Sequence, residues 1–294
     1  MKYTFLIPAY KSSFFKEALC SIQSQTYKDF LAVISDDCSP EPLYEIAKPF
    51  LSDPRFIYRK NKTNIGAEHL VNHWNLLVNE CLSPYLIMAS DDDYYDHTFL
   101  EEMDKLVVKY PNIELFRARL DQIDETGTTI RTEKPFDEHE ELPSFFSKLF
   151  GDHPHAIGQY IFKTSSLKQL GGFQDFPLGW FSDDATAIKC SLKGSVHSSE
   201  VLFHFRCSDM NISSKKKDIS YGELKLKSTL LFNEWIQKEQ IVPDKLIKQR
   251  RSYWYSQIGG IWDSIPIKQR LSTLLTVPGF SFWSIRNCFN TLFR

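Results

Sequence analysis

Residues 85–95 read YLIMASDDDYY, and the predicted fold class rests first on these residues. A short apolar run ends in three consecutive carboxylates, Asp91, Asp92 and Asp93. Such a run, followed at once by charge, is typical of a buried parallel strand that delivers acidic groups to the edge of its sheet. Ligands of open α/β sheets bind just outside the carboxyl ends of the strands. We therefore expect these carboxylates to lie at a ligand site.

A divalent metal is the ligand that these three acids suggest first. Adjacent like charges raise one another's pKa, so a bound cation stabilises them. Mg²⁺ and Mn²⁺ take oxygen ligands and keep positions open for the phosphate oxygens of a substrate. The alternative is a solvated acidic loop in which Asp96, His97 or Thr98 caps the next helix. The buried run that precedes the acids favours the metal site.

Three similar apolar runs occur earlier in the chain, at residues 3–7, 30–35 and 55–59. Between them, and before residue 85, apolar residues recur at helical spacing. Strands that alternate with helices of this length indicate a parallel sheet with helices on both faces, so the expected fold class is α/β.

Polar groups follow these strands as well. The second strand ends in an acid pair, and the turn after the third contains residues that tolerate a positive φ. These loops are expected to meet at one sheet edge, a place suited to a nucleotide. The expected nucleotide-contacting residues at this edge are Asp36, Asp37, Asn64, Gly66 and Asp91. Because no GxGxxG or GxxxxGK[ST] motif is present, dinucleotide-binding and P-loop sites are excluded.

Charge is unevenly distributed in this otherwise ordinary globular composition. The 294 residues are 42% hydrophobic and 24% charged, with a net charge of −2. Residues 214–294 nevertheless carry fourteen Lys and Arg against six Asp and Glu. We expect two parts, an α/β domain over residues 1–213 and a basic, aromatic-rich helical region over residues 214–294. The basic region favours an anionic partner such as a membrane surface.

Cysteine usage and hydropathy bear on the compartment. The six cysteines are scattered without a CxxC pair, which indicates free thiols in a reducing environment. The first apolar run is too short for a signal peptide, and no run of about 20 apolar residues occurs. We expect a cytoplasmic protein without a membrane span.

Several motifs together resemble family 2 glycosyltransferases, which have the GT-A fold. They are LIPAY (6–10), SDDCSP (35–40), NIGA (64–67), MASDDDYY (88–95), GGF (171–173) with GWFSDDATAIK (179–189), and FHFRCSDMNIS (203–213). The resemblance covers about residues 1–213. It implies a nucleoside-diphosphate sugar as donor, a Mn²⁺ or Mg²⁺ ion, inversion at the anomeric carbon, and no nucleic-acid partner.

The resemblance also implies roles for individual residues. The donor nucleotide would contact Pro8, Tyr10, Asp36, Asp37, Asn64, Gly66, Asp91 and Arg206. Asp92 would hold the metal with Asp93 in support, because Ser90 stands where the family often has an acid. Gly172 and Trp180 would face the acceptor. Asp184 would be the base and Asp183 would orient it, although the family's pair is commonly Glu-Asp, so which of the two is the base stays open.

Structural alternatives exist for these residues. The acid pair at 183–184 is also typical of a helix N-cap, and Arg206 of an exposed strand end. Trp180 and Phe181 either belong to the core or stack on an acceptor sugar. His69 and His73 have a spacing that can bind zinc, but the sequence offers no third ligand, so ordinary helix positions are favoured.

The aromatic residues among the basic C-terminal helices suit an amphipathic surface at a membrane interface. They are Trp254, Trp262, Phe280, Phe282, Trp283, Phe289 and Phe293. The alternatives are a helical cap packed on the domain and a homodimer contact.

The leading hypothesis is therefore an inverting, metal-dependent glycosyltransferase. Its acceptor would be a hydroxyl of a glycan or lipid-linked molecule, in bacterial-type surface polysaccharide synthesis. A nucleotidyltransferase is the rival enzyme, but the loop PAYKSSFF (8–15) lacks the glycines such an enzyme usually needs. A non-catalytic nucleotide-sugar-binding domain is the remaining alternative.

Overall fold

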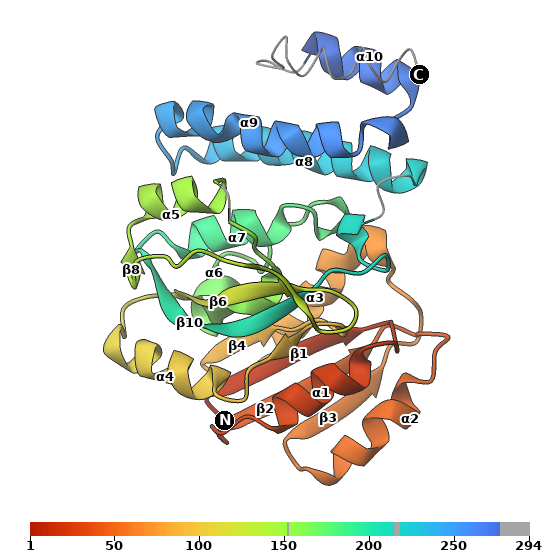
Figure 1. The fold of residues 1–294 in the computed structure, drawn as a ribbon, viewed down its shortest axis with the longest axis vertical. Helices are drawn as coiled ribbons and strands as arrows, with labels where there is room; N and C mark the ends of the chain where they lie inside the picture. Colours follow the sequence, from red (N-terminus) through yellow and green to blue (C-terminus); the bar gives the residue numbers. More distant parts are fainter. Residues whose placement is uncertain (152, 215–217, 277–294) are drawn as a thin grey trace.

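The computed structural model describes residues 1–276 except 152 and 215–217. A curled sheet has helices on both sides, and further helices stack at one end (Figure 1). The strands are β1 (Tyr3–Ala9), β2 (Phe30–Asp36), β3 (Phe56–Lys60), β4 (Tyr85–Met88), β5 (Tyr94–Tyr95), β6 (Leu115–Ile123), β7 (Thr129–Thr132), β8 (His139–Glu140), β9 (Tyr160–Lys163) and β10 (Ser195–Arg206). The helices are α1 (Phe15–Gln23), α2 (Leu43–Ala47), α3 (Leu70–Glu80), α4 (Phe99–Lys109), α5 (Leu142–Leu149), α6 (Thr164–Gln169), α7 (Ser182–Cys190), α8 (Ile219–Glu239), α9 (Asp244–Gly260) and α10 (Ile267–Thr276).

The strand order is β3-β2-β1-β4-β9-β6-β10-β5, with β7 beside β6 and β8 beside β10. The first four strands are parallel, as the alternation of strands and helices predicts. Ala9 pairs with Asp36 and Leu6 with Met88, so the carboxyl ends of β1, β2 and β4 lie at one edge. The predicted α/β class and the meeting of these loops are confirmed.

The second half of the sheet is mixed. Strand β9 lies between β4 and β6 and runs antiparallel to both. A short 3-10 helix, Ile157–Gln159, directly precedes β9.

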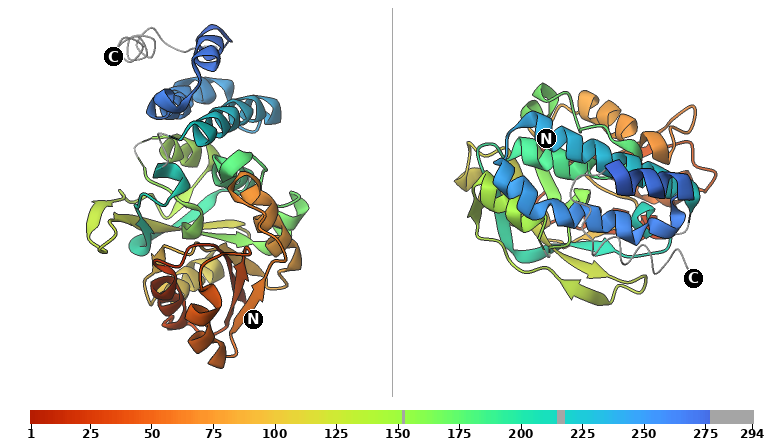
Figure 2. Two further views of the ribbon diagram at one scale, coloured as in Figure 1. Left: turned by 90° about the vertical axis from the view of Figure 1, so that its right-hand side faces the viewer. Right: turned by 90° about the horizontal axis from the view of Figure 1, so that it is seen from above.

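Apolar side chains fill two cores, one on each face of the sheet. Helices α1 and α4 cover one face, where Phe15, Phe99 and Phe116 are completely buried. Helices α3, α5 and α7 cover the other face, and α8 and α9 extend this second core. Figure 2 shows α8 and α9 lying side by side over this end of the molecule.

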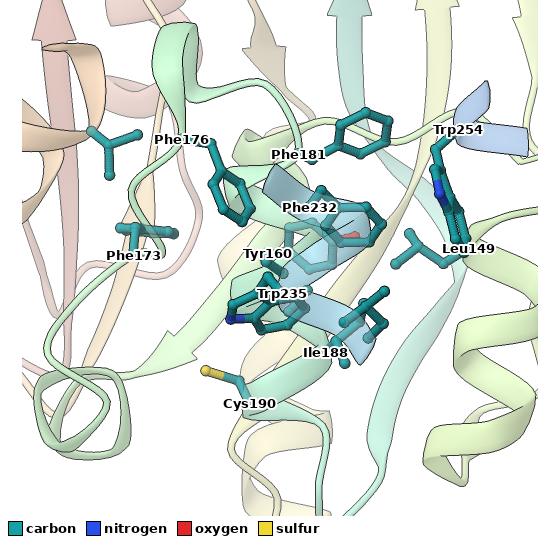
Figure 3. Close-up of a cluster of buried hydrophobic side chains, with 14 of the residues drawn as sticks. Leu149, Tyr160, Phe173, Phe176, Phe181, Ile188, Cys190, Phe232, Trp235 and Trp254 are labelled. Carbon is teal, nitrogen blue, oxygen red and sulfur yellow. The ribbon is translucent and has the colours of Figure 1, made fainter. Parts of the chain in front are cut away.

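The C-terminal helices share their core with the α/β part. Phe232 of α8 stacks on Phe181 with ring centroids 4.8 Å apart, and Trp254 of α9 packs edge-on against Phe232 (Figure 3). Trp254 and Trp262 are 0% and 3% exposed, so these two do not form a membrane surface. Our expectation was wrong for them because aromatic content does not reveal which helix face the core covers.

The remaining aromatic candidates, Phe280, Phe282, Trp283, Phe289 and Phe293, lie outside the described residues. No helix of the described chain is long and apolar enough to cross a membrane. The described cysteines (Cys20, Cys38, Cys81, Cys190 and Cys207) are free thiols, as expected.

Candidate functional site

The loop after β4 is tied to the loop after β1 by one of its three acids. Asp91 Oδ2 accepts hydrogen bonds from the backbone N–H groups of Tyr10 and Lys11, each at 2.7 Å. Burial raises the pKa of Asp91, and the nearby positive charge of Lys11 opposes that rise. Asp91 therefore joins the two strand ends while remaining at the sheet edge where we expected it.

Asp93 points into the protein. Its carboxylate accepts hydrogen bonds from the Ser90 hydroxyl and, at 2.8 Å, from the backbone N–H of Arg206. Burial and the negative charge of Asp92 raise the pKa of Asp93 to about 8. These contacts favour a structural role for Asp93 over the supporting metal role that we expected.

Asp92 is buried like its neighbours, at 6% exposure, but among the described residues its carboxylate accepts the fewest hydrogen bonds of the three. It contacts the ammonium group of Lys11 and, among the described residues, accepts no backbone N–H. Lys11 Nζ also lies 3.3 Å from Asp91 Oδ1, so one cation bridges two acids. Sequence reasoning missed Lys11; its position directly after LIPAY, at the same sheet edge, was the available signal.

Asp37 organises the turn after β3. Its carboxylate accepts hydrogen bonds from Asn61 Nδ2 at 2.9 Å and from the backbone N–H groups of Ile65 and Gly66 at 3.0–3.1 Å. Asn64 Nδ2 donates to the Asp37 carbonyl at 2.8 Å, and Gly66 has a φ of +83°. The expected convergence of Asp37, Asn64 and Gly66 is present.

Asp36 is more deeply buried, at 1% exposure. It accepts hydrogen bonds from the Ser39 N–H at 2.7 Å and from the Tyr58 hydroxyl at 2.5 Å. Pro8, within β1, is half-buried, whereas the Tyr10 side chain is 45% exposed at the mouth of this edge. Tyr10 therefore has an exposed ring available for contact. Asp36 holds the loop after β2 in place through its hydrogen bonds to Ser39 and Tyr58.

His73 is buried next to Asp37. Its Nε2 lies 2.8 Å from the Ser35 hydroxyl and its Nδ1 lies 3.9 Å from Asp37 Oδ1. Burial lowers the pKa of His73. No group of three or more His, Cys, Asp and Glu side chains that could hold a metal occurs in the described chain. The preference for ordinary helix positions at His69 and His73 stays a prediction.

Arg206, at the end of β10, is 1% exposed, so the exposed-strand-end interpretation is wrong. Its guanidinium pairs with Glu17 at 2.5 Å and donates to the Asp92 carbonyl at 3.0 Å. It also donates to the carbonyl of Glu125 at 3.1 Å and covers the ring of Phe14. These contacts give no support to the expected diphosphate contact. They indicate that Arg206 holds residues 91–93, the three-acid loop, in place.

The second acid pair lies in the first turn of α7. Phe181 precedes this helix in a left-handed conformation (φ +67°), and its buried ring fixes where the helix begins. Asp184 is 4% exposed, and Asp184 Oδ1 lies 2.9 Å from His155 Nε2. Asp183 is half-buried, and burial together with the charge of Asp184 raises the pKa of Asp183 to about 7. Sequence reasoning missed His155, and no local motif marked it.

The expected acceptor residues lie on either side of the loop before α7. Gly172 has a φ of +96° and packs against Asn75 of α3, whose side chain bonds the backbone of Phe173. A groove of about 250 Å³ beside Gly172 contains neither acid of α7. Trp180 is half-buried, with Lys225 Nζ 4.7 Å from its ring centroid, so α8 covers part of it.

The loop before α7 contacts the segment that follows the Asn64 and Gly66 turn. The segment Pro177–Gly179, which leads to the acids of α7, contacts Ala67–His69, which follows the Asn64 and Gly66 turn. A Cβ on Gly179 would press on the ring of Trp74 in α3. The turn at Asn64 and Gly66 and the second acid pair therefore lie on adjoining segments.

Comparison with known sequences identifies the family. The family model described as "Glycosyl transferase family 2" matches residues 4–165. The chain is 28% identical over 160 residues to an uncharacterised glycosyltransferase of Methanocaldococcus jannaschii, covering 53% of each chain. It is 30% identical over 111 residues to glycosyltransferase GlyA of Streptococcus pneumoniae, covering 37% of this chain and 15% of the relative. The chain thus spans about half or less of the length of these relatives.

Solved structures share the fold. TarS 1–349 of S. aureus in complex with UDP-GlcNAc has a TM-score of 0.65 and 14% identity, covering 99% of this chain and 79% of TarS. The mannosyltransferase PcManGT of Pyrobaculum calidifontis in complex with GDP-Man and Mn²⁺ has a TM-score of 0.59 and 14% identity, covering 90% and 73%. At this identity the likeness shows the fold alone, and the predicted GT-A fold is confirmed.

Proposed function

Because the chain belongs to glycosyl transferase family 2, we propose that it transfers a sugar from a nucleoside-diphosphate sugar to a hydroxyl group of an acceptor. The observation that carries the proposal is the convergence of three loops at one sheet edge, where Asp37 and Asp91 organise the backbone and Asp92 keeps an available carboxylate. Two proteins of the same fold, solved with UDP-GlcNAc and with GDP-Man and Mn²⁺, support this donor class.

The donor set at Asp92 fits a divalent metal. Mg²⁺ and Mn²⁺ are commonly held by one or two carboxylates and complete their coordination with phosphate oxygens and water. Asp92 supplies one such carboxylate, and the ammonium of Lys11 already marks the position as one that attracts a cation. When bound, the metal would neutralise charge on the departing diphosphate. Lys11 would add a charge-assisted contact to the same diphosphate.

The nucleotide would lie over the loops that Asp36 and Asp37 hold. The exposed ring of Tyr10 would contact it, beside Pro8, and the turn at Asn64 and Gly66 would form one wall. Asp91 would offer its remaining lone pairs to the ribose.

Asp184 would act as the general base. One of its oxygens faces His155, which leaves the other to accept the proton of the acceptor hydroxyl. The acceptor oxygen forms its bond to the anomeric carbon as the bond to the diphosphate breaks, and this single displacement inverts the configuration. A positioned base typically contributes about 10²–10⁴ in rate. Asp183 would orient the acceptor, with Gly172 and Trp180 along its approach.

The acceptor would be a glycan or a lipid-linked hydroxyl in bacterial-type surface polysaccharide synthesis. The excess of Lys and Arg over residues 214–294 suits a peripheral contact at the inner face of a membrane. The same region would serve a homodimer contact if the membrane contact is absent.

A thermal-shift panel tests the donor site. Nucleoside diphosphates and their sugars are added to the whole chain with and without Mn²⁺. A ligand at about 100 times its Kd stabilises a protein by roughly 2.7 kcal/mol. We expect a Mn²⁺-dependent shift with the nucleotides of one base, lost in Asp92→Asn and kept in Asp244→Asn, an exposed aspartate of α9. Asp184→Asn should bind the donor and lose turnover. If the folded protein shifts with none of these ligands, the proposal is overturned.

A further inference from the structure

A histidine from a distant loop contacts the proposed base. His155 lies before Ile157–Gln159, and its Nε2 is 2.9 Å from Asp184 Oδ1. The side chains of His155 and Asp184 are only 11% and 5% exposed. The pair is therefore shielded from solvent and is built into the fold.

Both ring nitrogens of His155 face acceptors. Nδ1 lies 3.2 Å from the backbone carbonyl oxygen of His153, and Nε2 faces the carboxylate of Asp184. A carbonyl oxygen accepts hydrogen bonds only, and so does an ionised carboxylate. A neutral imidazole has one N–H, so a ring that donates from Nδ1 to the His153 carbonyl forms an ion pair with Asp184 only when Nε2 is protonated as well. The geometry is that of an imidazolium–carboxylate pair.

The loop that carries His155 is held by a second buried ion pair. Arg117 Nη2 lies 2.5 Å from Glu133 Oε1, with both side chains at most 1% exposed. Arg117 also donates to the Pro154 carbonyl at 3.2 Å, and His153 Nδ1 lies 3.4 Å from Glu133 Oε1. These contacts fix the residues on the N-terminal side of His155 without any substrate.

Several charged or titratable groups face His155 from the elements around it. Asp184 and Asp183 of α7 favour its charged form, and Arg117 of β6 opposes it. Tyr253 of α9 lies 6.4 Å away between ring centroids, and Tyr160 of β9 lies in the field of both acids. Burial also opposes the charge, but the two carboxylates prevail and raise the pKa of His155 to about 9.

We propose that His155 is a positioning residue for the base: its imidazolium holds one oxygen of Asp184 and keeps this carboxylate ionised beside Asp183. The other oxygen then takes the acceptor proton, and the diphosphate leaves with the electron pair of the broken bond. The inference rests on the proposed function, because it assigns His155 a part in the same displacement. Without the imidazolium, the buried carboxylate of Asp184 would lie beside Asp183 with no cation to offset the two like charges.

The pH dependence of donor turnover tests this role. We expect the acid limb of the kcat profile of His155→Gln to move up by about 1–3 pH units, the usual effect of one nearby opposite charge. At pH values below the shifted limb, the kcat of the variant would be about 10- to 1000-fold lower than that of the wild type. At pH values above the limb, the two rates would approach each other. His197→Gln, which removes another buried imidazole, stacked on Phe136, should leave the limb in place. An unmoved limb in His155→Gln, or a uniform loss at all pH values, would overturn the proposal.

A measurement without substrate separates this inference from the proposed function. The ring signals of the histidines are followed by NMR through a pH titration of the folded protein, and the signal that His155→Gln lacks identifies His155. We expect His155 to titrate above the ordinary histidine range and to return toward that range in Asp184→Asn. If Asp184→Asn leaves its titration unchanged, the inference fails even for an active enzyme. If no nucleotide sugar binds or turns over, the proposed function fails. The NMR titration still tests the contact between His155 and Asp184 in that case.

Discussion

The coupling between the C-terminal helices and the α/β part yields a quantitative prediction for Phe232→Ala. Phe232 is completely buried, and its ring lies 4.8 Å from Phe181, 5.4 Å from Trp254 and 5.5 Å from Phe150, measured between centroids. Truncation of a buried Phe to Ala typically costs about 3–5 kcal/mol. We expect a cost in the upper half of that range. The surrounding rings belong to different segments of the α/β part and the C-terminal part, so they cannot all shift to fill the cavity that the substitution leaves.

The assay is equilibrium unfolding in urea, followed by tryptophan fluorescence and by far-UV circular dichroism. A loss of about 4 kcal/mol is a large part of the roughly 5–15 kcal/mol that holds a typical domain together. Both probes should shift together, because one core joins the two parts. Phe232→Leu is the matched control and should lose less, since it keeps most of the buried volume. A loss below about 1 kcal/mol, or two separate transitions in the wild type, would show that residues 219–276 fold as an independent unit.

Two other predictions concern single positions. Gly172→Ala should destabilise the protein more than Gly171→Ala: both glycines have positive φ, but only a Cβ on Gly172 would collide with Asn75. The strain common to both is about 1 kcal/mol, and equal melting temperatures for the two variants would contradict the clash. The stabilisation that His155 draws from Asp184 should be complete below pH 6.5 and disappear as pH rises through about 9, because the folded-state pKa is the raised one. Relative to His155→Gln, the wild type should therefore lose about 3 kcal/mol of its free energy of unfolding over that interval, and a difference that is constant with pH would refute the pair.

The meeting of the acidic loops at one sheet edge could be predicted because its signals are local. Each of β2 and β4 is a short apolar run with acids at its end, so periodicity places Asp36, Asp37 and the three-acid loop without knowledge of distant contacts. The division of labour among Asp91, Asp92 and Asp93 could not be predicted. It depends on which carboxylate meets the backbone of Lys11 and which meets that of Arg206, and both contacts span long stretches of chain.

Long-range partners also explain the other differences. The position of Arg206 at a strand end does not reveal that it forms an ion pair with Glu17 of α1. Nothing near His155 in the sequence points to Asp184. Trp254 and Trp262 lie among basic residues in the sequence, yet both side chains are buried in the core. In each case the sequence shows which residue type is present, but it does not show which distant part of the chain that side chain contacts.

The place of β9 bears on how the chain folds while it is being made. Strand β9 pairs with β4 through Tyr85 and Lys163, and with β6 through Leu115 and Phe162. When a ribosome has released β1 to β4, the free edge of β4 has no partner until residues 160–163 emerge. Strand β6, released in between, does not pair with β4 in the finished fold, because β9 lies between them. The nascent chain thus carries an open parallel half-sheet, an edge prone to pairing with other chains, over the synthesis of about a quarter of its length. Chains interrupted in that interval are the ones that chaperones would need to shield.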